Sequence, residues 1–116
     1  MGSLRRAKLC DGQTATGVSV RHELVTPSGN FTIEASFTEG TATTCTALVI
    51  DIDGSVTGNN YFALASHTFT AAERTAKCAM FHVADKPVEY MRTNITTLTK
   101  TGTNDVAVSI SILSTP

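Results

Sequence analysis

The chain has 116 residues, a formal net charge of −1, and a hydrophobic fraction of 41%. This length suits one domain with one core, and the balanced charge disfavours a nucleic-acid binder, which needs a basic face to displace counterions from phosphates. Only 16% of the residues are charged, well below the roughly 25% of an average soluble protein. Thr and Ser supply the missing polar surface, and because Thr is β-branched and stiff at χ1, the composition favours an all-β fold.

Residues 1–16 show neither a helical nor a strand period, so we expect a flexible N-terminal arm there and a β-sandwich domain over 17–116. The arm is also where we expect partner-binding residues, because a loose arm can add a strand or clamp to a neighbouring subunit. The candidates are Leu4, Arg5, Arg6 and Lys8. A cluster of this size is more typical of a solvated tail than of a DNA contact.

Residues 4–10 lack the ~7–15-residue apolar region of a signal peptide. No run reaches the ~18–20 apolar residues of a membrane span. The three cysteines, Cys10, Cys45 and Cys78, are odd in number and widely spaced, which fits neither a disulfide framework nor a zinc site. We therefore expect synthesis in a reducing cytoplasm, with Cys45 and Cys78 as buried free thiols in strands.

A two-residue hydrophobic period begins at Val18 and predicts the first strand of the domain, with one side formed by Val18, Val20, His22 and Leu24. The turn-forming sequence Pro-Ser-Gly-Asn at 27–30 ends it. Residues 31–38 give the clearest strand of the chain, with an inward face of Phe31, Ile33, Ala35 and Phe37.

The next strand is expected over 41–52 and ends in the apolar run 47–50, which suits a strand covered on both faces. Asp53-Gly54 and residues 58–60 predict a loop, and 61–69 another strand. Thr70 and Glu73 match a capping box, so a short connecting helix should begin there. Further strands are expected over 78–83, 88–99 and 106–113, the last with Val106, Val108, Ile110 and Ile112 facing one way.

These seven or eight short strands predict an all-β fold, a two-sheet antiparallel sandwich with one short connecting helix. Greek-key or jelly-roll connectivity is expected, but the sequence does not order the strands.

One acidic segment, residues 51–55, resembles the start of a calcium loop. An EF-hand needs Gly at its sixth position and Glu at its twelfth, but counting from Asp51 these are Val56 and Phe62. A looser calcium site on Asp51, Asp53 and Asn59 stays open, against the alternative that Asp53-Gly54 forms a hairpin turn.

No residue pattern predicts catalysis, so we expect a protein that is not an enzyme and uses no cofactor. A nucleophile and its base must lie within hydrogen-bond reach, whereas Cys78 and His82 would stand ~13 Å apart on a strand. The histidines His22, His67 and His82 fit packing or surface roles, and no Gly-x-Ser-x-Gly, phosphate-loop or His-Glu-x-x-His motif is present.

The stretch from Leu48 to Thr99 carries a family resemblance. Its features in order are Val49-Ile50-Asp51-Ile52-Asp53-Gly54, Tyr61-Phe62-Ala63-Leu64, His67 to Glu73, Ala79 to Val83, Lys86-Pro87-Val88-Glu89-Tyr90-Met91-Arg92, and Asn94 to Leu98. This order resembles small β-sandwich virion proteins of tailed bacteriophages, in which a Lys-Pro-Val-x-Tyr-x-Arg strand precedes a Val-rich last strand. The chain departs from the pattern at Asp51, where a small residue is common, and in having no Trp after the Asn pair.

The resemblance implies a structural protein of the bacteriophage virion, most specifically a capsid decoration (cement) protein that stabilises the shell. It implies a jelly-roll domain, a trimer, and protein–protein interaction with the major capsid protein or other virion proteins, without nucleic acid or membrane partners. A tail or head–tail joining protein is the near alternative. A carbohydrate-binding module is a further one, which would require exposed aromatic side chains forming a stacking platform.

Overall fold

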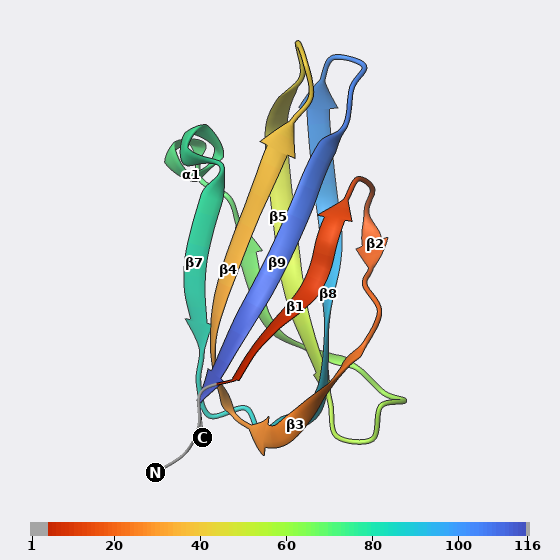
Figure 1. Ribbon diagram of the computed structural model, residues 1–116, viewed down its shortest axis with the longest axis vertical. Helices are drawn as coiled ribbons and strands as arrows, with labels where there is room; N and C mark the ends of the chain where they lie inside the picture. Colours follow the sequence, from red (N-terminus) through yellow and green to blue (C-terminus); the bar gives the residue numbers. More distant parts are fainter. Residues whose placement is uncertain (1–4, 116) are drawn as a thin grey trace.

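The structure is a computed structural model that describes residues 5–115, apart from the side chains of residues 5, 25–28 and 115. It is a sandwich of two antiparallel sheets (Figure 1), confirming the predicted fold class. One sheet has the order β1-β9-β4-β7, formed by β1 (Arg5–Gln13), β9 (Val106–Thr115), β4 (Asn30–Glu39) and β7 (Cys78–Val83).

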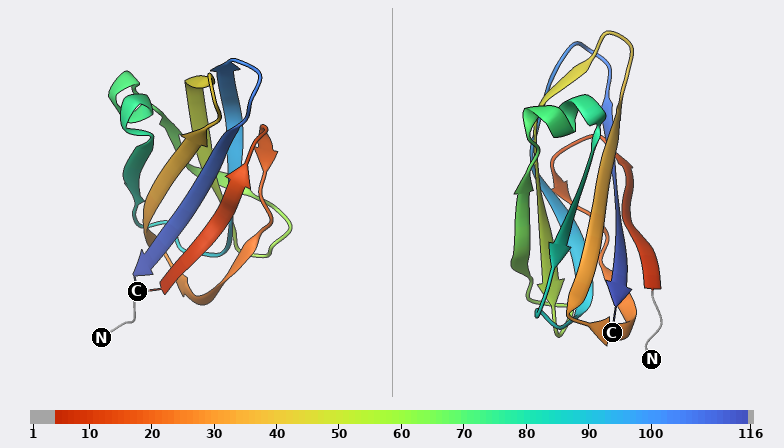
Figure 2. Two further views of the ribbon diagram at one scale, coloured as in Figure 1. Left: turned by 45° about the horizontal axis from the view of Figure 1, so that its top comes forward. Right: turned by 90° about the vertical axis from the view of Figure 1, so that its left-hand side faces the viewer.

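The second sheet is centred on two long strands, β8 (Val88–Thr101) and β5 (Thr44–Ser55). β6 (Phe62–Thr68) borders β5, while the short strands β2 (Gly17–Val18) and β3 (His22–Ser28) both pair with β8. Seen edge-on, the sheets form two layers, with the helix α1 (Ala71–Ala76) across one end (Figure 2).

The core lies between the sheets and follows the two-residue period of the sequence. The four inward positions predicted on β4 are at most 4% exposed, and the four on β9 at most 2%. The second sheet contributes residues with no exposed surface, which are Ile50, Ile52, Met91 and Ile95. Alternation therefore predicted both faces of β4 and β9 correctly. On β5, Leu48 and Ile50 are buried while Ala47 and Val49 are half-buried, so the prediction that the run 47–50 is covered on both faces is wrong.

The segment that begins at Val18 is not the single strand that its period predicts. Gly17 and Val18 pair with Ile95 and Asn94, whereas His22 and Glu23 pair with Met91 and Tyr90, one residue out of register. A one-residue slip turns side chains to the other face. Leu24 is consequently buried, but Val18 is 52% and Val20 85% exposed.

Asp53 and Gly54 lie inside β5, so the predicted turn at these residues is wrong, and the loop begins after Ser55. Gly54 is needed there for close packing. A Cβ added to it would lie 2.7 Å from Leu64 Cδ1 and 2.8 Å from Val88 Cγ1.

Residues 1–16 were expected to form an arm outside the core, but Arg5–Gln13 form β1, which pairs with β9. Leu9 on this strand is only 5% exposed. The pairing shifts register between Lys8 and Cys10 and again between Cys10 and Gln13. These shifts break the two-residue period, which explains why the sequence shows none.

The predicted helix and its capping box are confirmed. Thr70 is the N-cap, and α1 ends at Lys77 in the left-handed conformation. Across residues 5–115 no helix is long and apolar enough to cross a membrane.

Candidate interaction surface

The outer face of the β1-β9-β4-β7 sheet is a candidate surface for binding. Cross-strand pairing places its outward side chains in rows. One row contains Arg6, Leu113, Thr32 and His82, and the next contains Lys8, Ser111, Glu34 and Met80. Small hydroxyl side chains separate the few charges, so the face is suited to contact with another protein surface.

A shallow cavity of about 490 Å³ lies on this face, lined by Arg6, Thr32, Glu34, Met80, Ser111, Ile112 and Leu113. Arg6 and Glu34 give it charges of opposite sign, and no described ion pair joins the two side chains. Met80 supplies an apolar contact that is 59% exposed. The cavity thus offers both charge and apolar area to a partner.

The structure brings two of the predicted partner-binding residues onto this face. Arg6 lines the cavity, and Lys8 is exposed with its Nζ 3.6 Å from Asp11 Oδ1. Arg5 contributes backbone to β1, and its side chain is outside the description, as is the whole of Leu4. The prediction missed Glu34, Met80 and Leu113, because their neighbourhood depends on a strand order that the sequence does not reveal.

The three thiols are distributed differently from the prediction. Cys45 is buried as expected, but Cys78 is exposed and Cys10 half-buried. Cys78 points outward because Ala79 and Val83, one and five residues later, are the inward positions of β7. Burial raises the pKa of both Cys10 and Cys45, which lowers their reactivity as nucleophiles.

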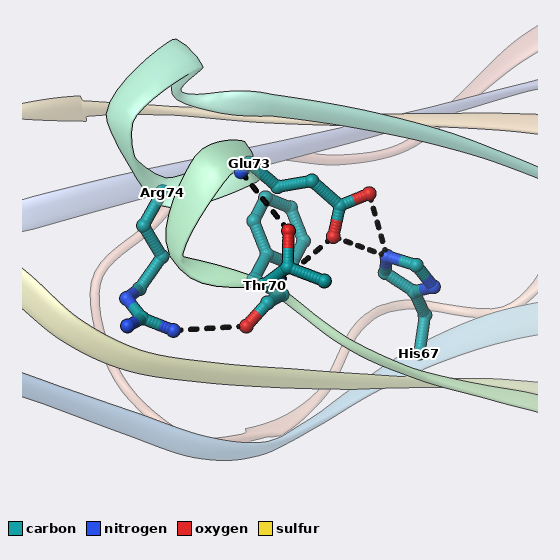
Figure 3. Close-up of polar contacts among 5 residues, drawn as sticks. His67, Thr70, Glu73 and Arg74 are labelled. Atoms are coloured by element: carbon teal, nitrogen blue, oxygen red, sulfur yellow. Dashed lines mark hydrogen bonds and ion pairs between the residues drawn. The ribbon is translucent and has the colours of Figure 1, made fainter.

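The best-connected polar cluster joins β6 to α1 (Figure 3). His67 Nε2 lies 3.0 and 3.2 Å from the two carboxylate oxygens of Glu73. Glu73 Oε1 also accepts a 2.9 Å hydrogen bond from the Thr70 N–H, and Thr70 Oγ1 accepts one of 3.1 Å from the Glu73 N–H. Arg74 donates to the Phe69 carbonyl at 2.9 Å. Every polar group in this cluster thus supports the helix start.

The same cluster links the two sheets. The His67 ring stacks on Phe81 of β7 at 4.7 Å and meets Phe69 edge-on at 5.6 Å. The Thr70 N–H, followed by His67, lowers the pKa of the Glu73 carboxyl. A carboxylate so engaged is a structural acceptor, and no described nucleophile bonds to His67.

Two of the three calcium candidates, Asp51 and Asp53, lie on β5, and Asn59 lies in the loop that follows it. Asp53 Oδ2 accepts a 3.4 Å hydrogen bond from Arg92 Nε. One of the candidate oxygen ligands is therefore already bonded to a guanidinium. Asp51 stands in the β5 ladder opposite Asn94 and Ser66. Within residues 5–115, no three His, Cys, Asp or Glu side chains are grouped closely enough to hold a metal ion.

Both tyrosines are covered by arginines. The Arg92 guanidinium lies 4.0 Å from the centre of the Tyr61 ring, and that of Arg21 lies 5.0 Å from the centre of the Tyr90 ring. Phe62 is 70% exposed, whereas Phe31, Phe37 and Phe69 are buried. The described residues thus present one bare ring and no row of rings for stacking on sugars.

No protein-family model and no curated protein sequence matches this chain. Among solved structures, the crystal structure of the SPBc2 prophage-derived protein YomS superposes with a TM-score of 0.60 at 9% sequence identity. The match covers 98% of this chain and 96% of that one. At this identity the likeness shows a shared fold, and it extends over almost the whole of both chains.

Proposed function

We propose that the chain is a structural protein of a bacteriophage virion, most specifically a decoration protein that binds the major capsid shell and stabilises it. It acts by binding and assembly, without catalysis or a cofactor. Its place of action is the virion, and its partners are the major capsid protein and further copies of itself.

One observation carries this proposal: the outer face of the β1-β9-β4-β7 sheet presents hydroxyl side chains with few charges. Binding of a small substrate favours an enclosed pocket, whereas the cavity on this face is open, with two opposite charges, hydroxyl groups and the apolar residues Met80 and Leu113 in its lining. Such a face packs against another protein, and many copies on one shell gain avidity from multivalency.

Two further features support the phage assignment. The similar structure YomS is described as prophage-derived, and its match extends over both chains. If β2 and β3 count as one interrupted strand, the sheets have the orders β1-β9-β4-β7 and β3-β8-β5-β6. From this order we infer a jelly roll, as the resemblance to virion proteins of tailed bacteriophages implies.

The alternatives differ in what they bind. A tail or head–tail joining protein would use the same kind of face on a different virion partner. A carbohydrate-binding module has less support, because Arg92 and Arg21 cover the two tyrosine rings and leave Phe62 as the bare aromatic side chain described.

The proposal is tested by co-sedimentation of the chain with expanded empty shells, which are assembled from the major capsid protein encoded in the same genome. We expect the purified chain to bind the shells saturably and raise their melting temperature. Arg6→Glu should weaken binding about tenfold, or 1.4 kcal/mol, because Arg6 lines the cavity. Lys86→Glu, an equal charge change at an exposed residue outside the face, should leave binding unchanged.

Two results would reject the assignment. The first is a wild-type chain that stays in the supernatant at every concentration of shells. The second is saturable binding to a glycan array without binding to shells, which would support the carbohydrate-binding alternative.

A further inference from the structure

The strand β7 forms an open border of its sheet. It pairs with β4 in unbroken register from Phe31↔Val83 to Ser36↔Cys78, and it has no second strand partner among the residues described. Figures 1 and 2 show it as the outermost strand beside β4, with α1 at one end. An open border of this kind presents unpaired backbone donors and acceptors.

The hydrogen-bond pattern shows which groups are free. The Phe37 N–H donates to the Lys77 carbonyl at 3.1 Å, so Phe37 and Lys77 form a hydrogen-bonded pair in the same register. Such pairs alternate along an antiparallel ladder. Ala79, Phe81 and Val83 therefore bond to β4, and the backbone N–H and C=O groups of Cys78, Met80 and His82 point away from the sheet.

The borders formed by β1 and β6 carry features that discourage added strands, and β7 does not. β1 has the charged side chains Arg6 and Lys8 and two register shifts, and β6 is irregular where Ile52 and Asp53 of β5 meet it. Charges and bulges are the usual protection of an edge strand. The sequence of β7, Cys-Ala-Met-Phe-His-Val, contains neither a formal charge at neutral pH nor a proline.

We propose that β7 pairs antiparallel with β7 of a second copy of this chain, about a twofold axis that passes through Met80. In this register Met80 stands opposite Met80 of the second copy, and Cys78 opposite His82. The three residues with free backbone groups are symmetric about Met80, so every such group finds a partner. The strand is thus complementary to itself, as a twofold interface requires.

The side chains fit the same register. Met80 is a large apolar residue that is 59% exposed, and the pairing covers it with its own counterpart. No charged residue of β7 faces a like charge across the axis, because the strand has none. The interface joins the two sheets into one continuous sheet. It covers Met80 at one side of the cavity, whereas Arg6 lies on β1 at the opposite border of the sheet.

A twofold pairing predicts a dimer, whereas the family resemblance implies a trimer. The solution mass separates the two states. The pairing also does not depend on shell binding, so a dimer that fails to bind shells would reject only the proposed function, and a monomer that binds them would reject only this pairing.

Sedimentation equilibrium on the full chain tests the pairing, over concentrations up to the millimolar range because an edge contact is small. We expect the mass to approach twice the 12.2 kDa of one chain. Met80→Lys places two like charges at the axis and should weaken dimerisation at least tenfold. Ser111→Lys also introduces one lysine, but on β9 in the interior of the sheet face, and it should leave the dimer intact.

Cross-linking provides a second readout that needs no change in affinity. In a Cys10→Ser/Cys78→Ser background, Met80→Cys should cross-link to its counterpart with a short bifunctional thiol reagent, since Cβ atoms of opposite residues lie about 4.5–5.5 Å apart. Ser36→Cys, one strand further in on β4, should not cross-link. A wild-type monomer or trimer, a Met80→Lys dimer of unchanged affinity, or equal cross-linking at both cysteines would overturn the pairing.

Discussion

Thr70 and Glu73 hold the first turn of α1 by each accepting a hydrogen bond from the other's backbone N–H. This arrangement was predictable because the two partners lie three residues apart in one local motif. The bond from Glu73 to His67 was not predictable, since it depends on how β6 runs beside the helix. Local chemistry is thus readable from the sequence, and contacts between elements are not.

The cap itself can be tested by Thr70→Ala. This change removes the hydroxyl that accepts the Glu73 N–H and should lower the free energy of unfolding by about 1 kcal/mol. Thr75→Ala, an exposed threonine later in the helix, should change it by less than about 0.5 kcal/mol. Urea denaturation measures both values. Equal losses of unfolding free energy in the two variants would show that the N-cap hydrogen bond adds no stability of its own.

Two carboxylates, Glu39 and Glu73, are expected to make the stability of the fold depend on pH in the acid range. The Cys45 N–H, 2.6 Å from Glu39 Oε2, and then Lys77 lower the pKa of Glu39, while Thr70 and His67 lower that of Glu73. A carboxyl whose pKa is lower in the folded chain stabilises the fold at pH values above its pKa in the unfolded chain, which is near 4.5. This stabilisation is lost as the pH falls through the pKa of the folded chain.

The stability should therefore fall as the pH drops below about 4.5, with proton uptake on unfolding. In Glu39→Gln/Glu73→Gln the fall should be shallower, and the stability at neutral pH lower, than in the parent chain. Glu89→Gln, a change at an exposed carboxylate, serves as the control. Urea titrations from neutral pH to pH 3 measure the slopes, and an unchanged slope in the double variant would contradict this account.

At the scale of the element, β1 shows where reasoning from periodicity fails. Strands β4 and β9 keep one register throughout their pairing and were predicted with their faces correct. β1 shifts register twice along nine residues, so its sequence has no period to detect. A shift of register also lies behind the wrong prediction for Val18 and Val20, because β2 and β3 pair with β8 one residue out of register with each other.

The membership of β1 in the core has a direct test. Leu9 is 5% exposed and belongs to the core cluster, so Leu9→Ala should lower the free energy of unfolding by about 2 kcal/mol or more. Lys8→Ala, its exposed neighbour, should change it by less than about 0.5 kcal/mol. Chemical denaturation compares the two, and a negligible effect of Leu9→Ala would return residues 1–16 to an arm outside the core.

At the scale of the whole molecule, the sequence predicted the class of fold but not the binding face. Arg6 and Lys8 were singled out from the chain alone, while Glu34 and Met80 join them only because β9 and β4 lie between β1 and β7. The free edge of β7 has the same origin, since edge and centre are properties of strand order. The candidate binding face and the free edge are thus surfaces that only the assembled sheets create.

The most direct test of the central claim is quantitative mass spectrometry of gradient-purified virions released from the host whose genome encodes this chain. If the chain is a virion structural protein, it will be found in the particles at a fixed ratio to the major capsid protein, whatever the number of purification steps. If it is abundant in the lysate but absent from the purified particles, the account is contradicted.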